Sequence, residues 1–275
     1  ISLMFGLIIL MSSYFALAGW LISWWTNGQA SALIFIGPSI WILFEWLRGW
    51  MFTGFPWMSI GYSQIDTFLL GWAPIFGVHG VSWCVSISAT IFLYFVLQKK
   101  YLLALLLMSI PYILGFAFNL ISWTNDTGQP VKTVIIQGGV PQNLKWTAEQ
   151  FPKTLDLYRQ ATKDAPTNSF VVWPEVAIPA SSDNIQSYLE FIQKEAQESS
   201  KKIAIGILEK NKDSALLFNS MLFLDGTREQ YYRKRHLVPF GEYFPVPRFI
   251  RQWMRLQSLP NTDLSKGDQV QPLIE

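Results

Sequence analysis

The sequence predicts a membrane-embedded bundle of apolar helices in residues 1–121, followed by an α/β domain in residues 122–275. Two observations predict this division. The first part contains only five charged side chains, whereas the second contains 18 of the 21 basic and 17 of the 19 acidic residues. The hydrophobic pattern also changes, from long apolar runs to short β-branched runs that alternate with amphipathic polar segments.

Four apolar runs in the first part are long enough to span a membrane. A spanning helix needs about 20 mostly apolar residues, because the hydrocarbon core is about 30 Å thick. The runs cover residues 1–25, 32–50, 73–97 and 101–121. They lack the polar face that a surface helix of a soluble protein would show. The first run also lacks the basic region and the cleavage site of a signal peptide. We therefore expect about four spans.

The few charges in the first part predict its orientation. Lys99 and Lys100 lie in the tight turn between the third and fourth runs, which the positive-inside rule assigns to the cytoplasm. The fourth span then delivers residue 122 and its successors to the opposite face, which is the periplasm if the source is bacterial. Arg48 lies at the non-cytoplasmic end of the second span and is an exception to the rule. A pairing with Glu45 one turn earlier, or a contact with a lipid phosphate, would explain it.

The composition excludes several classes of partner and cofactor. The formal net charge is +2, and each part carries about +1, so the sequence shows no basic cluster for nucleic acid. The single cysteine, Cys84, lies inside the third apolar run, which excludes a disulfide framework and a zinc site built from several thiolates. Because no metal-ligand cluster or phosphate loop appears either, we expect no metal and no cofactor.

The second part reads as alternating strands and helices of a layered α/β domain. We expect strands at residues 132–137, 169–173, 202–208, 220–224 and 230–235, and helices at 147–162, 183–199 and 247–256.

Candidate catalytic groups lie at the end of two of these strands or just after it. Glu175 comes just after the continuous apolar strand at 169–173, and ligands of open α/β sheets bind outside the carboxyl ends of the strands. The segment YRKRHLVPFGEYFP at residues 232–245 places Lys234 and Glu242 on either side of a turn. Proline and glycine fix the backbone of that turn, which favours a functional role over simple connection.

These motifs resemble two related families. A carboxylate in a WPE segment and a lysine ahead of an LVPFGE loop resemble the carbon-nitrogen hydrolase (nitrilase) superfamily, which implies an αββα sandwich. The membrane segment RGWMFTGFPW at residues 48–57, followed by GYSQ at 61–64, is similar to bacterial apolipoprotein N-acyltransferases. Those enzymes transfer an acyl chain from phospholipid to the N-terminal cysteine of a diacylated lipoprotein. The resemblance therefore implies a multi-pass enzyme of the bacterial inner membrane with a periplasmic catalytic domain. We expect this enzyme to be a monomer.

The resemblance implies a role for each matching residue. Glu175 matches the general base, Lys234 the cation that stabilises the oxyanion, and Glu242 a carboxylate that supports one of them. Trp146 and Asn219 match positions that the family requires near its active site. Three further residues match functional positions of the family near the membrane, namely Arg48, Gly54 and Trp57. We expect the pKa of Glu175 to be raised in a dry site, so that the carboxylate can accept the proton of a thiol.

One departure from the family pattern concerns the nucleophile. In the family the catalytic cysteine lies downstream of the LVPFGE loop, whereas no cysteine follows Cys84 in these 275 residues. We expect that the sequence is truncated at both ends, that the nucleophile lies beyond Glu275, and that residues 1–275 alone form no acyl-enzyme.

Two other functions remain open at this point. A membrane-anchored amidase or nitrilase-type hydrolase would use the same Glu175 and Lys234, with water in place of the lipoprotein amine. A mere anchor has no need of a structured loop such as residues 46–57, which favours the acyltransferase. A non-catalytic lipid or lipoprotein binder would lack the downstream cysteine.

Overall fold

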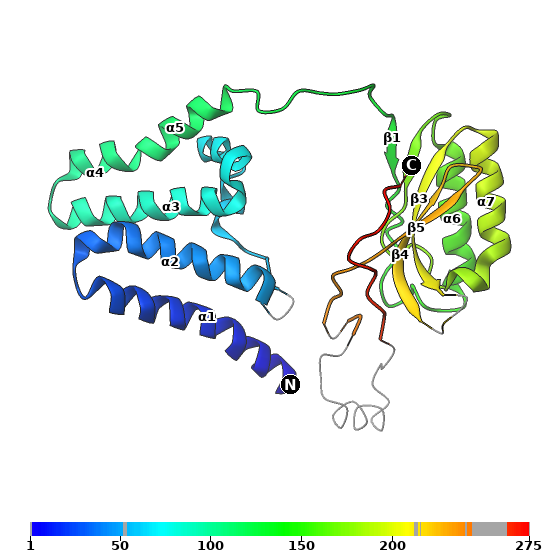
Figure 1. Ribbon diagram of the computed structural model, residues 1–275, viewed down its shortest axis with the longest axis horizontal. Coiled ribbons are helices and arrows are strands. Elements are labelled where there is room, and N and C mark those ends of the chain that lie inside the picture. The colour runs from blue at the N-terminus through cyan, green and yellow to red at the C-terminus, as the bar shows by residue number, and fades with distance from the viewer. Residues whose placement is uncertain are drawn as a thin grey trace. The chain divides into compact units, whose positions relative to one another are not determined.

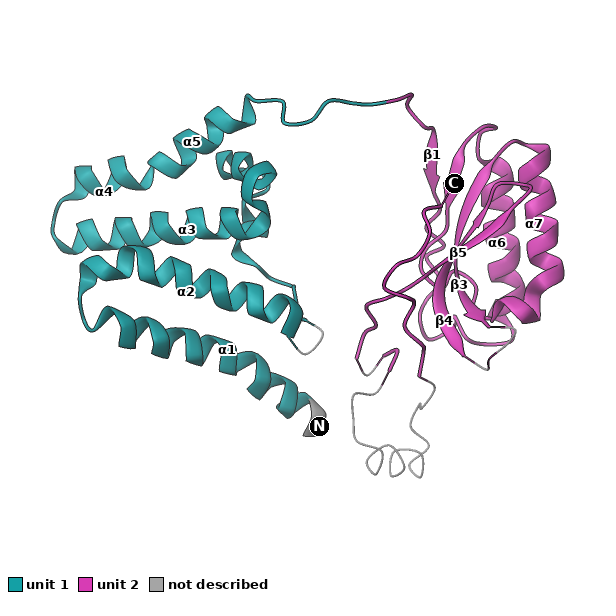
Figure 2. Cartoon of the chain, in the orientation of Figure 1, with its two compact units in different colours: residues 1–127 teal, residues 128–275 magenta. Residues whose placement is uncertain are grey.

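The computed structural model describes residues 2–51, 54–211, 214, 216–239, 241–243 and 263–274. The chain divides into two compact units, residues 1–127 and 128–275 (Figure 2). The helix expected at 247–256 lies outside the described residues.

All the regular secondary-structure elements that the structure describes in unit 1 are helices (Figure 1). Its α-helices are α1 (Ser2–Thr26), α2 (Ala30–Trp50), α3 (Ala73–Leu97), α4 (Tyr101–Met108) and α5 (Ile110–Asn119), and two short 3₁₀ helices, η2 (Ile60–Gln64) and η3 (Phe68–Trp72), connect α2 to α3. Within the described residues, four segments are long and apolar enough to cross a membrane, at residues 4–26, 30–50, 68–97 and 101–119. The expected helical bundle is confirmed.

Two of the expected spans are less regular than their sequences suggest. The third bends at Gly77, whose φ of 63° lies in the left-handed region. The fourth divides at Ser109 into α4 and α5, and Pro111 lies in the first turn of α5. Proline suits that position because the first N–H groups of a helix have no partner within it.

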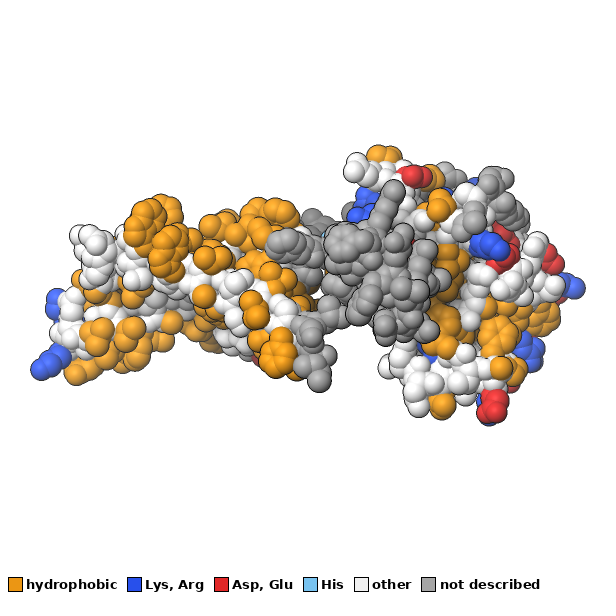
Figure 3. Space-filling view, turned by 90° about the horizontal axis from the view of Figure 1, so that it is seen from below, with side chains coloured by type: hydrophobic (Ala, Val, Ile, Leu, Met, Phe, Trp, Pro, Cys, Tyr) orange, Lys and Arg blue, Asp and Glu red, His pale blue; other side chains and the backbone are white. Residues whose placement is uncertain are grey.

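The surface of unit 1 differs in kind from that of unit 2. Figure 3 shows hydrophobic side chains spread over the visible face of unit 1, whereas charged side chains gather mainly on unit 2. Large apolar side chains such as Ile9, Trp24 and Leu102 are each more than 60% exposed. Exposed apolar surface of this extent is stable in lipid and not in water, so unit 1 has the surface of a membrane protein.

Unit 2 contains a five-stranded mixed sheet in the order β1-β2-β3-β4-β5. Its strands are β1 (Thr133–Ile135), β2 (Phe170–Val172), β3 (Lys202–Lys210), β4 (Leu217–Leu224) and β5 (Glu229–Arg233), and its helices are α6 (Gln150–Asp164), η4 (Ser182–Ile185) and α7 (Gln186–Glu198). The first three strands are parallel, and β4 and β5 are antiparallel to their neighbours. All five expected strands therefore form, with ends that differ by a few residues.

One face of the sheet carries the core of unit 2. Alternate residues of β3, Ile203, Ile205 and Ile207, are fully buried and pack with Leu189 and Ile192 of α7. This alternation is what a sheet with one covered face requires. The described residues thus form one sheet with one helical layer, which is consistent with part of the αββα sandwich that the family resemblance implies.

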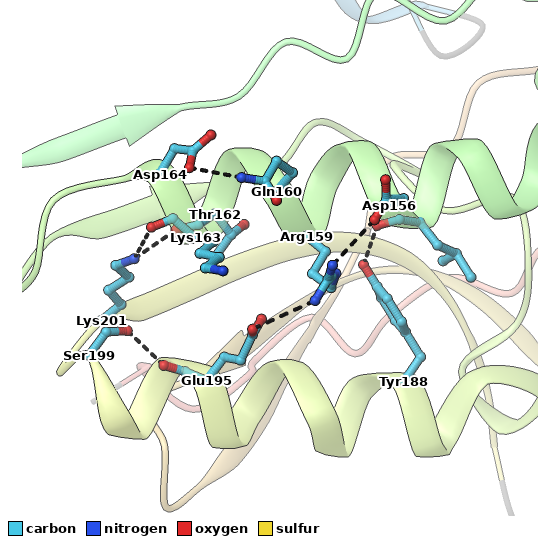
Figure 4. Close-up of polar contacts among 11 residues, drawn as sticks. Asp156, Arg159, Gln160, Thr162, Lys163, Asp164, Tyr188, Glu195, Ser199 and Lys201 are labelled. Carbon is cyan, nitrogen blue, oxygen red and sulfur yellow. Dashed lines mark hydrogen bonds and ion pairs between the residues drawn. The ribbon is translucent and has the colours of Figure 1, made fainter.

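Polar contacts join α6 and α7 over this core (Figure 4). Arg159 of α6 lies 4.0 Å from Glu195 of α7, and the Tyr188 hydroxyl donates to the carbonyl oxygen of Leu155 at 2.7 Å. The buried Lys201 donates to the carbonyl oxygens of Thr162 and Lys163, at the C-terminal end of α6. A cation is well placed there, because the last carbonyl groups of a helix lack partners within it.

Candidate active site in unit 2

Four of the predicted site residues form one hydrogen-bonded cluster. The Lys234 Nζ atom lies 2.8 Å from Glu175 Oε1 and 3.1 Å from Glu242 Oε2. Asn219 Nδ2 donates to Glu175 Oε1 at 2.6 Å and to Glu242 Oε1 at 2.5 Å. Residues separated by up to 67 positions in the sequence thus hold two carboxylates around one ammonium group.

The strand pairing brings these residues together. The Lys234 backbone N–H donates to the Asn219 carbonyl oxygen at 2.8 Å, which extends the β4–β5 ladder by one pair. Side chains directly opposite each other on antiparallel strands lie on the same face. The turn that follows returns Glu242 to the cluster, where its carboxylate accepts the Val238 N–H at 2.7 Å.

Glu175 is held by the segment that follows β2. Trp173 is fully buried, stacks on Tyr158 and donates to Thr162 Oγ1 at 2.9 Å, so it anchors the segment in the core. Val176, directly after Glu175, has a φ of 46°, which is an unfavourable conformation for a β-branched residue. Backbone strain of this kind is frequent at functional sites, where the surrounding structure maintains it.

Gly206 of β3 allows this segment to approach the sheet. A Cβ atom at Gly206 would lie 2.1 Å from the Pro174 carbonyl oxygen and 2.7 Å from the Glu175 Cα atom. The Ala177 N–H donates to the Gly206 carbonyl oxygen at 2.8 Å. Glycine within a strand often marks such a close backbone approach.

The cluster keeps Glu175 ionised. The hydrogen bond from Lys234 lowers the pKa of Glu175; burial opposes this effect, and the hydrogen bond from Asn219 adds to it. The raised pKa that we expect from a dry site is therefore wrong, because the adjacent ammonium outweighs the desolvation. Burial lowers the pKa of Lys234, but its hydrogen bonds to Glu175 and Glu242 prevail and raise it.

A pocket of about 470 Å³ opens on this cluster. Its lining includes Glu175, Asn219 and Glu242, together with Lys145 and Trp146 from the turn between β1 and α6. Trp146 is 56% exposed and presents an aromatic surface there. The pocket therefore combines an ion-pair cluster with an apolar wall, as small-molecule sites commonly do.

The three other predicted site residues belong to unit 1. Arg48 is buried at the end of α2, and its guanidinium carbon lies 5.8 Å from the centre of the Phe15 ring. The suggested pairing of Arg48 with Glu45 is not seen. Glu45 Oε1 instead accepts hydrogen bonds from Trp41 Nε1 at 3.1 Å and from the Ile60 N–H at 3.0 Å. A contact between Arg48 and a lipid phosphate stays a prediction.

Gly54 and Trp57 lie in the loop between α2 and η2. Gly54 has a φ of 86°, and a Cβ atom there would lie 2.1 Å from the Gly49 carbonyl oxygen, so the turn requires glycine. Trp57 is 69% exposed. The bond from the Ile60 N–H to Glu45 joins this loop to α2.

The sequence reasoning gave no role to two residues of the site. Lys145 stands beside Trp146 in the segment QNLKW, and only its position in the pocket distinguishes it from other lysines. Gly206 interrupts a strand of branched residues, KIAIGIL, and that interruption could have indicated the close approach. Among the described residues, no three His, Cys, Asp or Glu side chains gather to hold a metal ion.

Two family models match the chain. The model of the apolipoprotein N-acyltransferase N-terminal domain matches residues 1–91, and the carbon-nitrogen hydrolase model matches residues 135–271. The first match covers the first two apolar segments and most of the third, and the second covers the whole cluster around Lys234.

Curated relatives agree with both matches. The chain is 34% identical to an apolipoprotein N-acyltransferase of Coxiella burnetii over 269 residues, which are 96% of this chain and 55% of the relative. It is 33% identical to one of Vibrio cholerae over 272 residues, which are 95% of this chain and 54% of the relative. The chain thus spans about half the length of these relatives.

Proposed function

The chain belongs to the apolipoprotein N-acyltransferase family, and on that basis we propose that its protein transfers a fatty acyl chain from phospholipid to lipoproteins. The acceptor is the N-terminal amine of the diacylglyceryl-cysteine of an apolipoprotein. The observation that carries this proposal is the Lys234 ammonium held between Glu175 and Glu242 in a pocket of a unit that follows membrane-spanning helices.

The first half-reaction uses the thiol of the cysteine that the family resemblance implies downstream of the LVPFGE loop. Glu175 accepts the thiol proton, and the thiolate attacks the ester carbonyl of the phospholipid. The Lys234 ammonium stabilises the oxyanion, and the intermediate collapses to a thioester as Glu175 returns the proton to the leaving glycerol oxygen. A carboxylate that is ionised at neutral pH, as the lowered pKa of Glu175 favours, suits the first step.

The second half-reaction reverses the same proton path. The acceptor amine attacks the thioester and its proton passes to Glu175, while Lys234 again stabilises the oxyanion. The thiolate then leaves and regains its proton from Glu175, which completes a ping-pong cycle. Asn219 and Glu242 hold the two reacting side chains in place through their hydrogen bonds.

The remaining assignments belong to the same proposal. Residues 1–121 form the membrane domain, in the bacterial inner membrane, and residues 122–275 form the catalytic domain, on its periplasmic side. The protein acts as a monomer and binds no nucleic acid. Trp146 contacts the substrate beside the cluster. Arg48, Gly54 and Trp57 act on substrate access in the membrane domain.

The test follows acyl transfer in the full-length protein. Phospholipid with a labelled acyl chain should first give an acylated enzyme, detected by mass, which then releases the label to a lipopeptide amine. Glu175→Gln should abolish both steps, whereas Glu190→Gln, an exposed carboxylate on α7, should abolish neither. Release of the label to water would instead identify a hydrolase, and failure of the wild-type protein to become acylated would refute the proposal.

A further inference from the structure

The pocket in unit 2 contains a cation that the mechanism above does not use. Lys145 lines the same pocket as Glu175 and Glu242, yet no hydrogen bond or ion pair of its ammonium group is found among the described residues. Lys234, in contrast, is shared by the two carboxylates. Lys145 can therefore offer all three of its N–H donors to a ligand.

The turn that carries Lys145 is ordered by its own backbone. The N–H groups of Leu144 and Lys145 both donate to the Pro141 carbonyl oxygen at 3.0 Å, and the Thr147 N–H donates to the Leu144 carbonyl oxygen at 2.9 Å. The Lys145 side chain is half-buried, and this burial lowers its pKa, an effect that the charge of Glu175 partly offsets. A partly desolvated ammonium without an acceptor gains more from an anion than a fully hydrated one.

The charges of the pocket point to the kind of ligand. Glu175, Glu242 and Lys234 together carry a net charge of −1, which would repel an anionic ligand. Lys145 brings the net charge to zero and adds donors that the carboxylates do not occupy. Of the two substrates in the proposed reaction, only the phospholipid carries an anion close to the reacting ester, namely its phosphodiester.

We propose that Lys145 binds the phosphodiester anion of the acyl donor and so selects phospholipids in the first half-reaction. This assignment rests on the proposed function. Under this assignment Lys145 acts only in the first half-reaction, whereas Glu175 and Lys234 act in both. The acceptor amine of the second half-reaction carries no negative charge that Lys145 could bind.

The test compares Lys145→Met and Lys145→Arg with wild-type full-length protein, with Lys153→Met on the exposed face of α6 as the control. Acyl-enzyme formation is measured from a phospholipid and from a diacylglycerol with the same acyl chains but no phosphate. For Lys145→Met we expect kcat/KM for the phospholipid to fall about 10- to 100-fold, the usual effect of one hydrogen bond to a charged group. Turnover of the diacylglycerol should not change, Lys145→Arg should retain most activity, and Lys153→Met should behave as wild type.

Two further measurements identify what Lys145 acts on. Transfer from pre-acylated enzyme to a lipopeptide should keep its rate in Lys145→Met, and inorganic phosphate should inhibit wild type more strongly than this variant. Equal losses on both donors, or a slower second half-reaction, would show that Lys145 acts through Glu175 and would overturn the assignment. Unchanged phospholipid turnover in Lys145→Met would also overturn the assignment, even if inorganic phosphate inhibited wild type more strongly than the variant. If wild type transfers from neither donor, the proposed function itself fails.

Discussion

The close approach of β3 to the Glu175 segment predicts a strong effect of Gly206→Ala. The added methyl group would lie 2.1 Å from the Pro174 carbonyl oxygen, and ordinary contacts begin near 3.4 Å, so β3 and the Glu175 segment must separate by about 1.3 Å. Overpacking of this kind costs about 1–3 kcal/mol, and loss of the hydrogen bond from the Ala177 N–H to the Gly206 carbonyl adds about 1 kcal/mol. We therefore expect the free energy of unfolding to fall by about 2–4 kcal/mol.

The same displacement would move the Glu175 carboxylate away from Lys234. A shift of about 1 Å in a reacting group can reduce a rate about 100-fold, and we expect a loss of this size in acyl-enzyme formation. Stability is measured by urea unfolding followed by circular dichroism, and the local change by hydrogen exchange at the Ala177 amide.

A matched control makes the same substitution at Gly241, a glycine that lines the pocket. At Gly241 an added Cβ atom would lie 3.6 Å from Val238 Cγ1, an ordinary contact, so Gly241→Ala should change the free energy of unfolding by less than about 0.5 kcal/mol. If Gly206→Ala kept wild-type stability and wild-type protection of the Ala177 amide, the steric argument for Gly206 would be wrong.

Two further predictions concern charged groups of unit 2. Because Lys234 lowers the folded-state pKa of Glu175, the stability that this carboxylate contributes is present above its ordinary pKa of about 4.3 and is lost as the pH falls through the lowered value. Urea unfolding between pH 6 and pH 3 should show this loss in wild type, and Lys234→Met should lose less over the same range. Lys201→Met should lower the free energy of unfolding by about 1–3 kcal/mol, because two carbonyl groups at the end of α6 lose a charged donor. The exposed Lys202→Met serves as its control in thermal unfolding, and equal melting temperatures for the two variants would contradict the prediction.

The success of sequence reasoning differed between the two units for a physical reason. Long apolar runs and the lack of charge predicted four membrane-spanning segments, since each span must satisfy its backbone hydrogen bonds locally. The β-branched runs likewise predicted all five strands. The break of the fourth span at Ser109 was not predicted, although Pro111 follows two residues later.

In the candidate site, the sequence identified the reactive side chains better than their pKa values and their neighbours in space. Glu175, Lys234 and Glu242 were singled out from strand ends and from a resemblance, and the structure brings them within hydrogen-bonding distance. The direction of the pKa shift of Glu175 was wrong, because it depends on which charge lies beside the carboxylate. Lys145 had no expected role, since the pocket that gives it one joins segments far apart in the chain.

The sequence by itself determined which part of this protein has a membrane surface, where its strands and helices lie, and which side chains could carry acyl-transfer chemistry. These properties depend on hydrophobic periodicity and on local residue types, which are readable along the chain. Only the tertiary structure decided that Lys234 is shared by two carboxylates, that Gly206 admits the Glu175 segment, and that Lys145 lines the same pocket as Glu175 and Glu242. Such outcomes depend on the distance between groups that are remote in sequence, because Coulomb interactions and steric contacts act through space.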